Sequence, residues 1–503
     1  MTLNEHLRAQ AEPTQPTGET ILVLGAGMAG LSLALALDGS GKQLVIVERD
    51  AEPPQIAPHE AFESWKRSGV AQFRHPHVFV GRLHGLLSKR YPQLFAELEA
   101  AGCRGSPLSE HLPPGLRDGY LPHADDVHVA PLYGRRPTFE YVLRRYVGRL
   151  PHVRFVHGAT AQGLVCEGNA GALRVVGLEI KRNDVRETLR GDVVIDAAGK
   201  NSPVAGWLEQ LGISMKTVNQ PSQLAYFCRH YRLREGEPEP EHRELSADLD
   251  YLKYAIFYAE RGHFAIAFGC AEDEPDLVDL LRRADGFDSM CQQIPGLARW
   301  VNRAEPATKV LGAGKIANRW TRVAHADRAR GLFLLGDAAF EANPIYGRGC
   351  AAAFVQSHVL AEALVSEAEW SRRSARFRAG LQAEIYPHHR ASGWADRLFR
   401  SRAQRARGKR GSPWRWFVTY VYERVVVPAV LVDLVLAREI LLAMAMDNPA
   451  GPIRVARFLL RILRVRLSTP GNAALLLPPI PDRVDLLERV TRPLQAQAGS
   501  SER

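Results

Sequence analysis

The stretch Ile21-Leu22-Val23-Leu24-Gly25-Ala26-Gly27-Met28-Ala29-Gly30 decides the fold of this chain. Its first four residues are apolar and partly β-branched, as a buried parallel strand requires. Gly25 allows a tight turn, Gly27 lets the backbone approach a pyrophosphate, and Gly30 permits close packing of helix on strand. The helix predicted over residues 29–37 directs its positive dipole end at the phosphates. The stretch therefore predicts a dinucleotide-binding unit.

The next segment completes this unit. Residues 42–47 predict a second strand, which ends at Glu48. An acid at this strand end, about 20 residues after the glycines, accepts hydrogen bonds from both ribose hydroxyls and disfavours a 2′-phosphate. Glu48 is therefore a candidate cofactor-binding residue.

An alternative for the same region is a membrane span, because residues 21–37 carry no charge and are nearly long enough to cross a bilayer. Three glycines lie within its first ten residues. Glu5 and Glu19 stand where a signal peptide would carry positive charge. We therefore reject both the membrane span and the signal peptide.

A second glycine-containing block lies far downstream, from Gly336-Asp337 to Gly347-Arg348-Gly349. It follows an apolar run that predicts a buried strand, so the Asp337 carboxylate should point into the crevice at the carboxyl end of the sheet. Pro344 stiffens a turn, and the two late glycines let the backbone come close to a flat ring. An alanine-rich helix over residues 350–364 should direct its positive end there, where it would stabilise negative charge on a reduced flavin.

With these blocks in hand, the chain resembles the FAD-dependent monooxygenases of the aromatic-hydroxylase type (group A). Within them it is most similar to the bacterial branch of polyether epoxidases and distant squalene-epoxidase relatives. A third block, residues 193–203, is similar to the Asp-Gly block of that group, which touches FAD and NAD(P)H. Here two alanines separate Asp196 from Gly199, and this departure weakens the inference of NADPH use.

The resemblance, whose first block includes Glu48 and Arg49, implies further cofactor contacts, of which Arg49 is one. The loop 72–77 resembles one that carries a flavin-proximal arginine, so Arg74 is a candidate contact and, with Pro344, a candidate catalytic residue. The segment that starts at residue 135 resembles a helix whose arginine reaches the cofactor, a role carried over to Arg136. The alternative for either arginine is a solvated or ion-paired surface residue. For His75 and His77 the favoured interpretation is a satisfied histidine rather than a catalytic one.

The resemblance also implies the reaction. Reduced FAD and oxygen form a C4a-hydroperoxide, which transfers one oxygen atom to an electron-rich substrate. NADPH or NADH is the expected electron donor. A phenol would need a base, and no residue stands out for that task. An alkene needs none, so an apolar alkene or polyene is favoured over an aromatic substrate.

The expected fold class is α/β (α+β). A Rossmann-like FAD-binding domain is interleaved with an antiparallel-sheet substrate domain, whose strands we expect at residues 224–232, 251–258 and 263–268. A helical C-terminal region follows. The expected boundaries are a flexible N-terminal arm (1–18), the FAD-binding domain (19–60, 130–214 and 311–370), the substrate domain (61–129 and 215–310) and the basic helical region (371–503).

Composition limits the other possibilities. The 503 residues should hold more than one core. The six cysteines are scattered, which argues against zinc, iron–sulfur and disulfide frameworks and for a reducing, cytoplasmic compartment. The net charge of +10 is concentrated in the C-terminal third, at residues 397–415 and 452–467.

The second of these segments has arginines at helical spacing and leucines on another face: Arg454, Arg457, Arg461, Arg464, Leu459, Leu460, Leu463 and Leu467. Such a helix either lies on the cytoplasmic face of an anionic membrane or packs on the flavin domain with its arginines solvated. No recognition motif supports binding of nucleic acid.

Three other functions stay open. A prenyl-chain reductase or carotenoid-type cyclase shares the fold and prefers apolar substrates. A flavin halogenase would carry Trp-x-Trp-x-Ile-Pro, whereas residues 414–418 here have the wrong ending and position. A flavin-bearing accessory protein would hold FAD without turnover.

Overall fold

The computed structural model describes residues 18–168, 173–240, 245–409, 411–447, 452–468 and 480–501. Residues 1–17 of the expected N-terminal arm lie outside the described residues.

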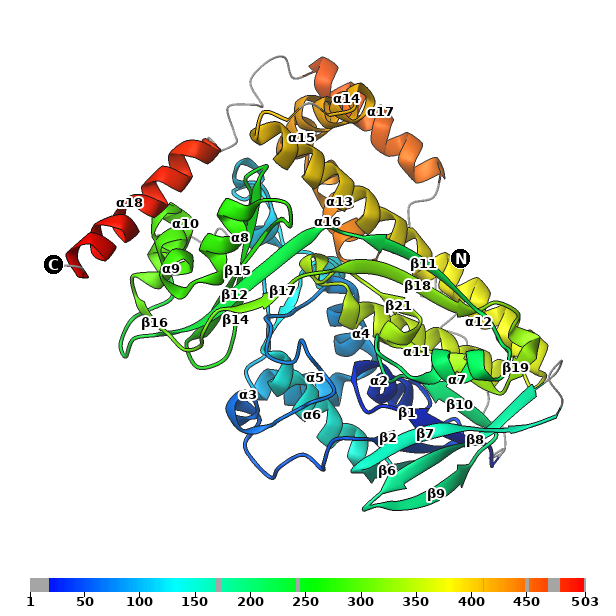
Figure 1. Ribbon diagram of the computed structural model, residues 1–503. Helices are drawn as coiled ribbons and strands as arrows, with labels where there is room; N and C mark the ends of the chain where they lie inside the picture. The colour runs from blue at the N-terminus through cyan, green and yellow to red at the C-terminus, as the bar shows by residue number, and fades with distance from the viewer. Residues whose placement is uncertain are drawn as a thin grey trace.

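A five-stranded parallel sheet in the order β20-β10-β1-β2-β6 forms the centre of the cofactor half (Figure 1). Its strands are β1 (Thr20–Leu24), β2 (Gln43–Glu48), β6 (Val153–His157), β10 (Val193–Asp196) and β20 (Leu332–Leu334). Leu24 pairs with Asp196, and Asp196 with Leu334, so the carboxyl ends of β1, β10 and the edge strand β20 lie level. The two strands and the intervening helix predicted from the first fingerprint are confirmed.

Helices cover one face of this sheet, and their bounds are α2 (Met28–Ala36), α4 (Gly81–Arg90), α5 (Pro92–Ala100), α6 (Arg136–Gly148), α11 (Gly349–Ser366) and α12 (Trp370–Glu384). Ile21, Ile195 and Phe333 point into this core. Ser357 of α11 donates a hydrogen bond to the carbonyl of Ala29 in α2 over 3.0 Å. Within the described part of the chain, α11 alone is long and apolar enough to cross a membrane, but 78% of it is buried inside the protein.

A small second sheet and a helix cover the opposite face. They comprise β7 (Ala159–Glu167), β8 (Leu173–Arg182), β9 (Val185–Arg190), β19 (Ala329–Arg330) and α7 (Val204–Gln210). Leu22 and Val194 point to this side, alternating with the residues that face the helices. A strand that is buried on both faces appears in the sequence as a continuous apolar run, and for this reason the central strands β1 and β2 could be predicted from the sequence.

The half expected to face the substrate is built on an antiparallel sheet. Its strands are β12 (Leu224–Leu233), β13 (Ser246–Asp248), β14 (Leu252–Tyr258), β15 (His263–Ala271), β16 (Ala304–Pro306) and β17 (Leu311–Ala313). The three strands predicted here are confirmed, with β15 paired antiparallel to both β12 and β14. The helices on its outer side are α8 (Pro275–Arg282), α9 (Ala284–Gln293) and α10 (Pro295–Val301).

Short elements join the two halves. One set is β11 (Met215–Pro221), β18 (Ala317–Val323) and β21 (Phe340–Glu341), which form a three-stranded sheet. The other is η1 (Pro58–Glu60), α3 (Ala61–Ser64), β3 (Val78–Phe79), β4 (Arg104–Gly105), η2 (Leu108–His111), η3 (Pro114–Leu116), η4 (Ala124–His128) and β5 (Leu132–Tyr133).

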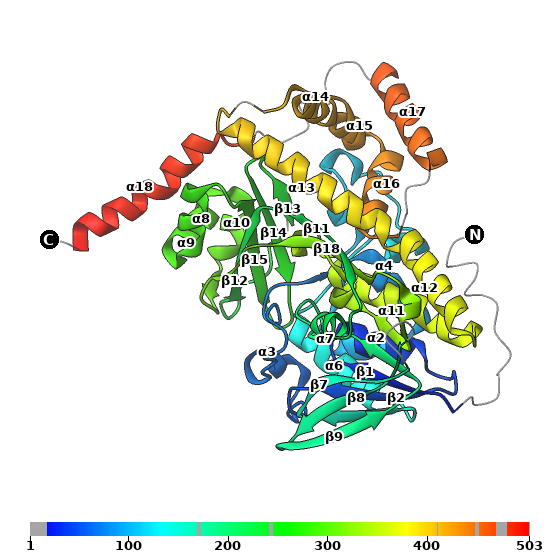
Figure 2. The same ribbon diagram turned by 45° about the vertical axis from the view of Figure 1, so that its right-hand side comes forward.

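The C-terminal region is helical throughout its described parts, as expected. Its elements are α13 (Tyr386–Ala406), α14 (Pro413–Val421), η8 (Tyr422–Val426), α15 (Val427–Val432), α16 (Leu434–Met444), α17 (Pro452–Ser468) and α18 (Arg483–Ser501). In both views α14, α15 and α17 gather at one end of the molecule, whereas α18 returns to lie beside α9 (Figures 1 and 2). Leu486 and Val490 of α18 are buried in the core of the antiparallel sheet. The α/β (α+β) fold class with a helical C-terminal region is confirmed.

Candidate cofactor and substrate site

The three sequence blocks meet at the carboxyl ends of β1, β10 and β20. Gly25 has a φ of +106°, and a Cβ there would lie 2.6 Å from the carbonyl oxygen of Ala197. Gly336 has a φ of +62°, and a Cβ there would lie 2.7 Å from the Cβ of Ala29. The Gly25–Gly30 block therefore lies against both the 193–203 block and the Gly336–Gly349 block, although more than 150 residues separate it from each of them in the sequence.

The glycines of this region fall into two kinds. A Cβ on Gly30 would lie 2.2 Å from the carbonyl oxygen of Gly25, so Gly30 is required for packing inside the protein. A Cβ on Gly27 or on Gly349 would meet no atom within 4 Å. These two stand where α2 and α11 begin, so their backbones border open space at two positive helix ends. Open space at a helix N-terminus fits an anionic cofactor.

Glu48 lies against the glycine turn, where the ribose-binding acid of such a fold is expected. Its Oε2 accepts a hydrogen bond from the backbone N–H of Ala26 over 3.1 Å. Arg67 Nη2 lies 2.8 Å from the same oxygen, and Arg67 also pairs with Asp50 and Glu140. This buried ion network was missed by the sequence analysis, because no local pattern marks Arg67.

Asp337 lies at the other end of the crevice, after β20. Burial raises the pKa of its carboxyl to about 6, although nearby Arg136 acts in the opposite direction. The backbone N–H of the preceding Gly336 donates to Gln356 Oε1 over 3.1 Å. Gln356 Nε2 and Ser32 Oγ are buried and have no hydrogen-bond partner among the described residues. The unpaired buried donors in α2 and α11, together with the open glycines where both helices begin, fit a polar, phosphate-bearing group such as FAD.

The loop from Asn343 to Gly349 is held from the C-terminal region. Asp396 of α13 is 2% exposed and accepts hydrogen bonds from Asn318 Nδ2 (2.8 Å), Asn343 Nδ2 (2.8 Å) and Tyr346 Oη (2.7 Å). Burial raises the pKa of Asp396, and the three donors counteract this. One buried carboxylate thus fixes both ends of the turn that contains Pro344.

Arg348 connects the same loop to two C-terminal helices. Its Nη1 donates to Ser392 Oγ of α13 over 2.9 Å, and its Nη2 donates to the carbonyl of Ala443 in α16 over 3.3 Å. Gly347 has a φ of +64°, and a Cβ there would lie 2.4 Å from Val78. The predicted turn with its left-handed glycine is therefore present, but its supports come from segments that no local motif reveals.

The two arginines proposed for the cofactor occupy different environments. Arg136 is buried at the start of α6, where it contacts Glu140 (3.2 Å) and His77 Nε2 (3.3 Å). Arg74 is exposed, and its guanidinium donates to the carbonyls of Phe62 (3.0 Å) and of Glu63 (3.1 Å). A cofactor contact stays a prediction for each of them, as it does for Arg49, which is exposed.

The surface that faces this loop is apolar with neutral histidines. Ile345 packs with Tyr226, Cys228 and Ile316. His75 Nδ1 lies 3.5 Å from Cys228 Sγ.

Burial lowers the pKa of His75, that of His77 to about 3 and that of His230 to about 4. It also raises the pKa of the Cys228 thiol above its usual range. These groups are therefore uncharged at neutral pH.

No protein-family profile matches the chain. Among curated proteins, Protein Rv3254 of Mycobacterium tuberculosis is 25% identical over 385 residues, which cover 72% of this chain and 75% of that protein. Digeranylgeranylglycerophospholipid reductase 2 of Methanopyrus kandleri is 25% identical over 71% of this chain and 79% of its own length. Squalene epoxidase 4 of Arabidopsis thaliana is 36% identical over 66 residues, or 13% of each chain.

Solved structures resemble the whole fold. The flavin-dependent brominase Bmp2 aligns with a TM-score of 0.60 and 17% identity, covering 90% of this chain and all of Bmp2. PqsL, a probable FAD-dependent monooxygenase from Pseudomonas aeruginosa, aligns with a TM-score of 0.57 and 16% identity, covering 80% of this chain and all of PqsL. The resemblance stated from the sequence is thereby confirmed in structure: the chain has the fold of FAD-dependent monooxygenases and halogenases.

Proposed function

We propose that the protein is an FAD-dependent monooxygenase that inserts one oxygen atom into an apolar alkene or polyene. The convergence of the three blocks carries this proposal, because it places two open helix N-termini and two acids, Glu48 and Asp337, at the carboxyl edge of one sheet. Gly27, Glu48 and Arg49 would hold the adenosine and pyrophosphate, on the turn whose packing requires Gly25 and Gly30. Gly336, Asp337, Gly347, Gly349 and Arg136 would hold the ribityl chain and the flavin.

FAD, when bound, would supply the redox and oxygen-transfer chemistry. The chain's own residues would position the ring and exclude water. The loop held by Asp396 would border the ring, with Pro344 and Ile345 closing it off from solvent. The N-terminus of α11 would stabilise negative charge that develops on the reduced ring.

The apolar wall opposite this loop supports an alkene over a phenol. A phenol must lose its proton to a base, and a histidine with a pKa near 3 or 4 is a weak one. Tyr226, Cys228 and Ile316 form a buried apolar cluster behind Ile345, and apolar surroundings suit a hydrocarbon better than a charged phenolate. NADPH or NADH is the proposed electron donor, and the cytoplasm is the proposed compartment.

Isotope labelling tests the reaction. The purified protein should be yellow, and its flavin should be reduced by NADPH or NADH in the absence of oxygen. With ¹⁸O₂ and a linear polyene such as squalene, we expect one labelled oxygen atom in the product. Product formation without incorporation of label would contradict monooxygenation.

Prenyl-chain reduction is the second candidate, supported by the 25% identity to the geranylgeranyl-lipid reductase. It requires no oxygen, so anaerobic turnover that saturates double bonds would favour it. Halogenation, supported by the likeness to Bmp2, would require bromide or chloride and place halogen in the product. A flavin-bearing accessory protein would show no turnover with any of these substrates.

A further inference from the structure

Exposed large apolar side chains are concentrated in the C-terminal helices. Eleven of the eighteen found among the described residues lie between residues 414 and 467, so their distribution is far from even. These eleven are Trp414, Trp416, Phe417, Tyr420, Val435, Met444, Val455, Leu459, Leu460, Leu463 and Leu467. Monomeric soluble proteins rarely leave such a cluster uncovered unless it contacts something else.

Helix α17 shows that this exposure is not a consequence of poor packing. One side of α17 is covered, because Phe458, Ile462 and Val465 pack with Ala429 and Leu436 of α15 and α16. A second apolar side of α17 is exposed to solvent. Leu459, Leu460, Leu463 and Leu467 on it are between 56% and 77% exposed.

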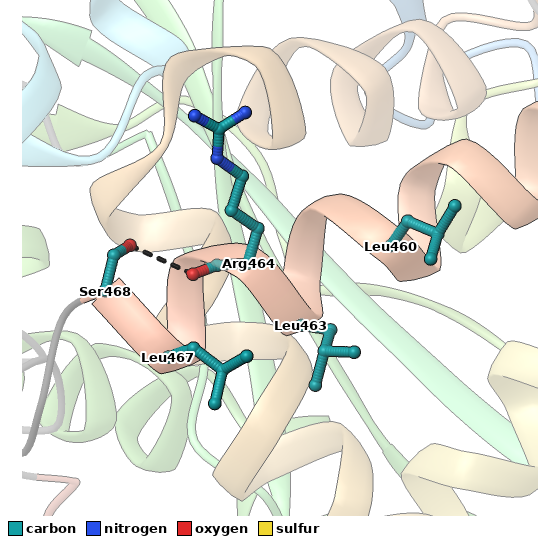
Figure 3. Close-up of a pocket in the computed structure, with 5 residues that line it drawn as sticks. All are labelled: Leu460, Leu463, Arg464, Leu467 and Ser468. Atoms are coloured by element: carbon teal, nitrogen blue, oxygen red, sulfur yellow. Dashed lines mark hydrogen bonds between the residues drawn. The ribbon is translucent and has the colours of Figure 1, made fainter.

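Leu460, Leu463 and Leu467 border a shallow, open depression on the molecular surface, together with Arg464 and Ser468. Leu463 and Leu467 project from one side of α17, whereas Arg464 extends from the other (Figure 3). We call Leu459, Leu460, Leu463 and Leu467 the leucine face.

The arginines of α17 are divided in the same way, into some that contact the protein and some that are exposed. Arg454 pairs with Glu439 (3.0 Å) and Arg461 with Asp433 (2.8 Å), which fixes the helix on α16 and on the residue before it. Arg457 and Arg464 are exposed, and no ion pair involves them within the described residues. The leucine face is therefore accompanied by unpaired positive charge.

The other basic segment is built differently. In residues 397–415, Arg402 pairs with Asp248 (2.7 Å) and Arg407 with Asp273 (2.9 Å). Arg405 pairs with Glu423. Lys409 also pairs with Asp273 (3.8 Å), so four of the seven described basic residues of this segment are paired. Arg415, between Trp414 and Trp416 of α14, is exposed and has no ion pair within the described residues, as is the case for Arg457 and Arg464 of α17.

We infer that the leucine face of α17, with the exposed aromatic side chains of α14, is a contact surface for an anionic phospholipid bilayer. An amphipathic helix with arginines beside leucines inserts its apolar side at the boundary of headgroups and acyl chains. Trp414, Trp416 and Tyr420 have the amphipathic rings that favour this interface. The inference concerns an interaction surface and is independent of the proposed reaction.

Charge favours a bilayer over a second copy of the chain. Two copies joined through the leucine face would bring Arg457 and Arg464 of one close to the same residues of the other, and no acid lies between residues 447 and 482 to pair with them. Anionic headgroups both neutralise these arginines and accept the leucines. Each basic residue near such a surface strengthens binding by about fivefold.

Cosedimentation with vesicles tests the inference. The full-length flavoprotein should bind vesicles of phosphatidylglycerol and phosphatidylcholine, bind pure phosphatidylcholine more weakly, and be largely released by high salt. The triple substitution L460S/L463S/L467S should lower the partition coefficient at least about tenfold on both vesicle types. The pair R457Q/R464Q should lower it by about 25-fold, on the anionic vesicles alone.

The matched controls are L121S and V185S, which remove exposed apolar side chains elsewhere and should leave binding unchanged. Flavin content and the thermal unfolding midpoint should stay the same in all variants, since every substituted side chain is exposed. The inference is overturned if wild type binds neither vesicle type, or if the triple variant binds as wild type does. Reversible dimerisation that the triple variant abolishes, without vesicle binding, would identify a second copy as the partner instead.

Discussion

The two ends of the cofactor crevice are supported in different ways. At the pyrophosphate end, contacts are made by the backbone: Gly30 packs on the carbonyl of Gly25, and Gly25 packs on that of Ala197. At the flavin end, the Asn343–Gly349 loop depends on side chains from helices that follow it, chiefly Asp396 and Ser392. At the first end an atom added to Gly25 or Gly30 would therefore overlap the backbone, whereas the second end depends on a few polar bonds that one substitution removes.

The largest effect should come from a pair of glycine substitutions at the first end. Gly30→Ala places a Cβ 2.2 Å from a backbone oxygen, so the free energy of unfolding should fall by about 3 kcal/mol. Gly27→Ala meets no protein atom, so the unfolding of the FAD-free protein should change by less than about 1 kcal/mol, while its FAD affinity falls at least about tenfold. Urea unfolding and fluorescence titration with FAD measure the two quantities.

Equal losses of stability in the two variants would contradict the division into packing and cofactor-facing glycines. Gly39→Ala is unsuitable as a control, because Gly39 has a φ of +72° and any side chain there would be strained. Gly206→Ala is suitable, since Gly206 lies in helix α7 and faces open space.

Substitution at the second end should have a smaller effect on stability and a clearer one on the flavin. Asp396→Ala leaves three donors without their acceptor, which we expect to lower the free energy of unfolding by about 2 kcal/mol. A loosened loop would move the start of α11 away from the ring. The two-electron reduction potential of the bound flavin should then become more negative by about 30 mV, equivalent to about 1.4 kcal/mol.

Tyr346→Phe is the graded control for Asp396, because it removes one of the three bonds. Its effects on stability and on the potential should be about a third as large. If Asp396→Ala lowers stability but leaves the potential unchanged, Asp396 is a structural residue without influence on the cofactor.

The same contrast explains what could be predicted from the sequence. Glycines, apolar runs and the acid at Glu48 are local signals of backbone geometry, and the elements around them were predicted to within about two residues. The supports of the flavin end are not local. Asp396 lies 53 residues from Asn343, and Arg67 lies 73 residues from Glu140, so these pairs become visible only once the chain is folded.

The C-terminal helix α17 illustrates an intermediate case. Its helical spacing of arginines and leucines was predicted correctly, because periodicity is a local property. Which apolar side faces the protein was not predictable. The helix packs through Phe458 and Ile462, and the leucines expected to be its apolar side are exposed.

A pH titration probes one acid at the flavin end of the crevice. Burial raises the pKa of Asp337 to about 6 in the folded protein, so its ionised form is disfavoured without a ligand. The free energy of unfolding of the FAD-free protein should therefore decrease as pH rises from about 4 to about 6, and then level off. Ribityl hydroxyls donate to the carboxylate, so FAD affinity should fall by up to about tenfold per pH unit below 6, or about 1.4 kcal/mol.

Asp337→Asn should remove the pH dependence of FAD binding. Asp196→Asn is the matched control, because burial also raises the pKa of Asp196 to about 6, yet its oxygens accept from Ala198 N (3.1 Å) and Ser202 Oγ (2.7 Å). This control should change the pH dependence of stability and retain that of FAD binding. The assignment of Asp337 to the cofactor is wrong if both variants behave alike.

The smallest effect should come from Arg74. Its guanidinium is exposed and bonded to the carbonyls of Phe62 and Glu63, so Arg74→Gln should change the free energy of unfolding by about 0.5 kcal/mol. Arg136→Gln should weaken FAD binding more strongly, because Arg136 is buried between Glu140 and His77 and acts on the charge of Asp337. Equilibrium dialysis of FAD with both variants ranks the two arginines. A larger loss of affinity for Arg74→Gln would show that this side chain leaves the carbonyls when the cofactor binds.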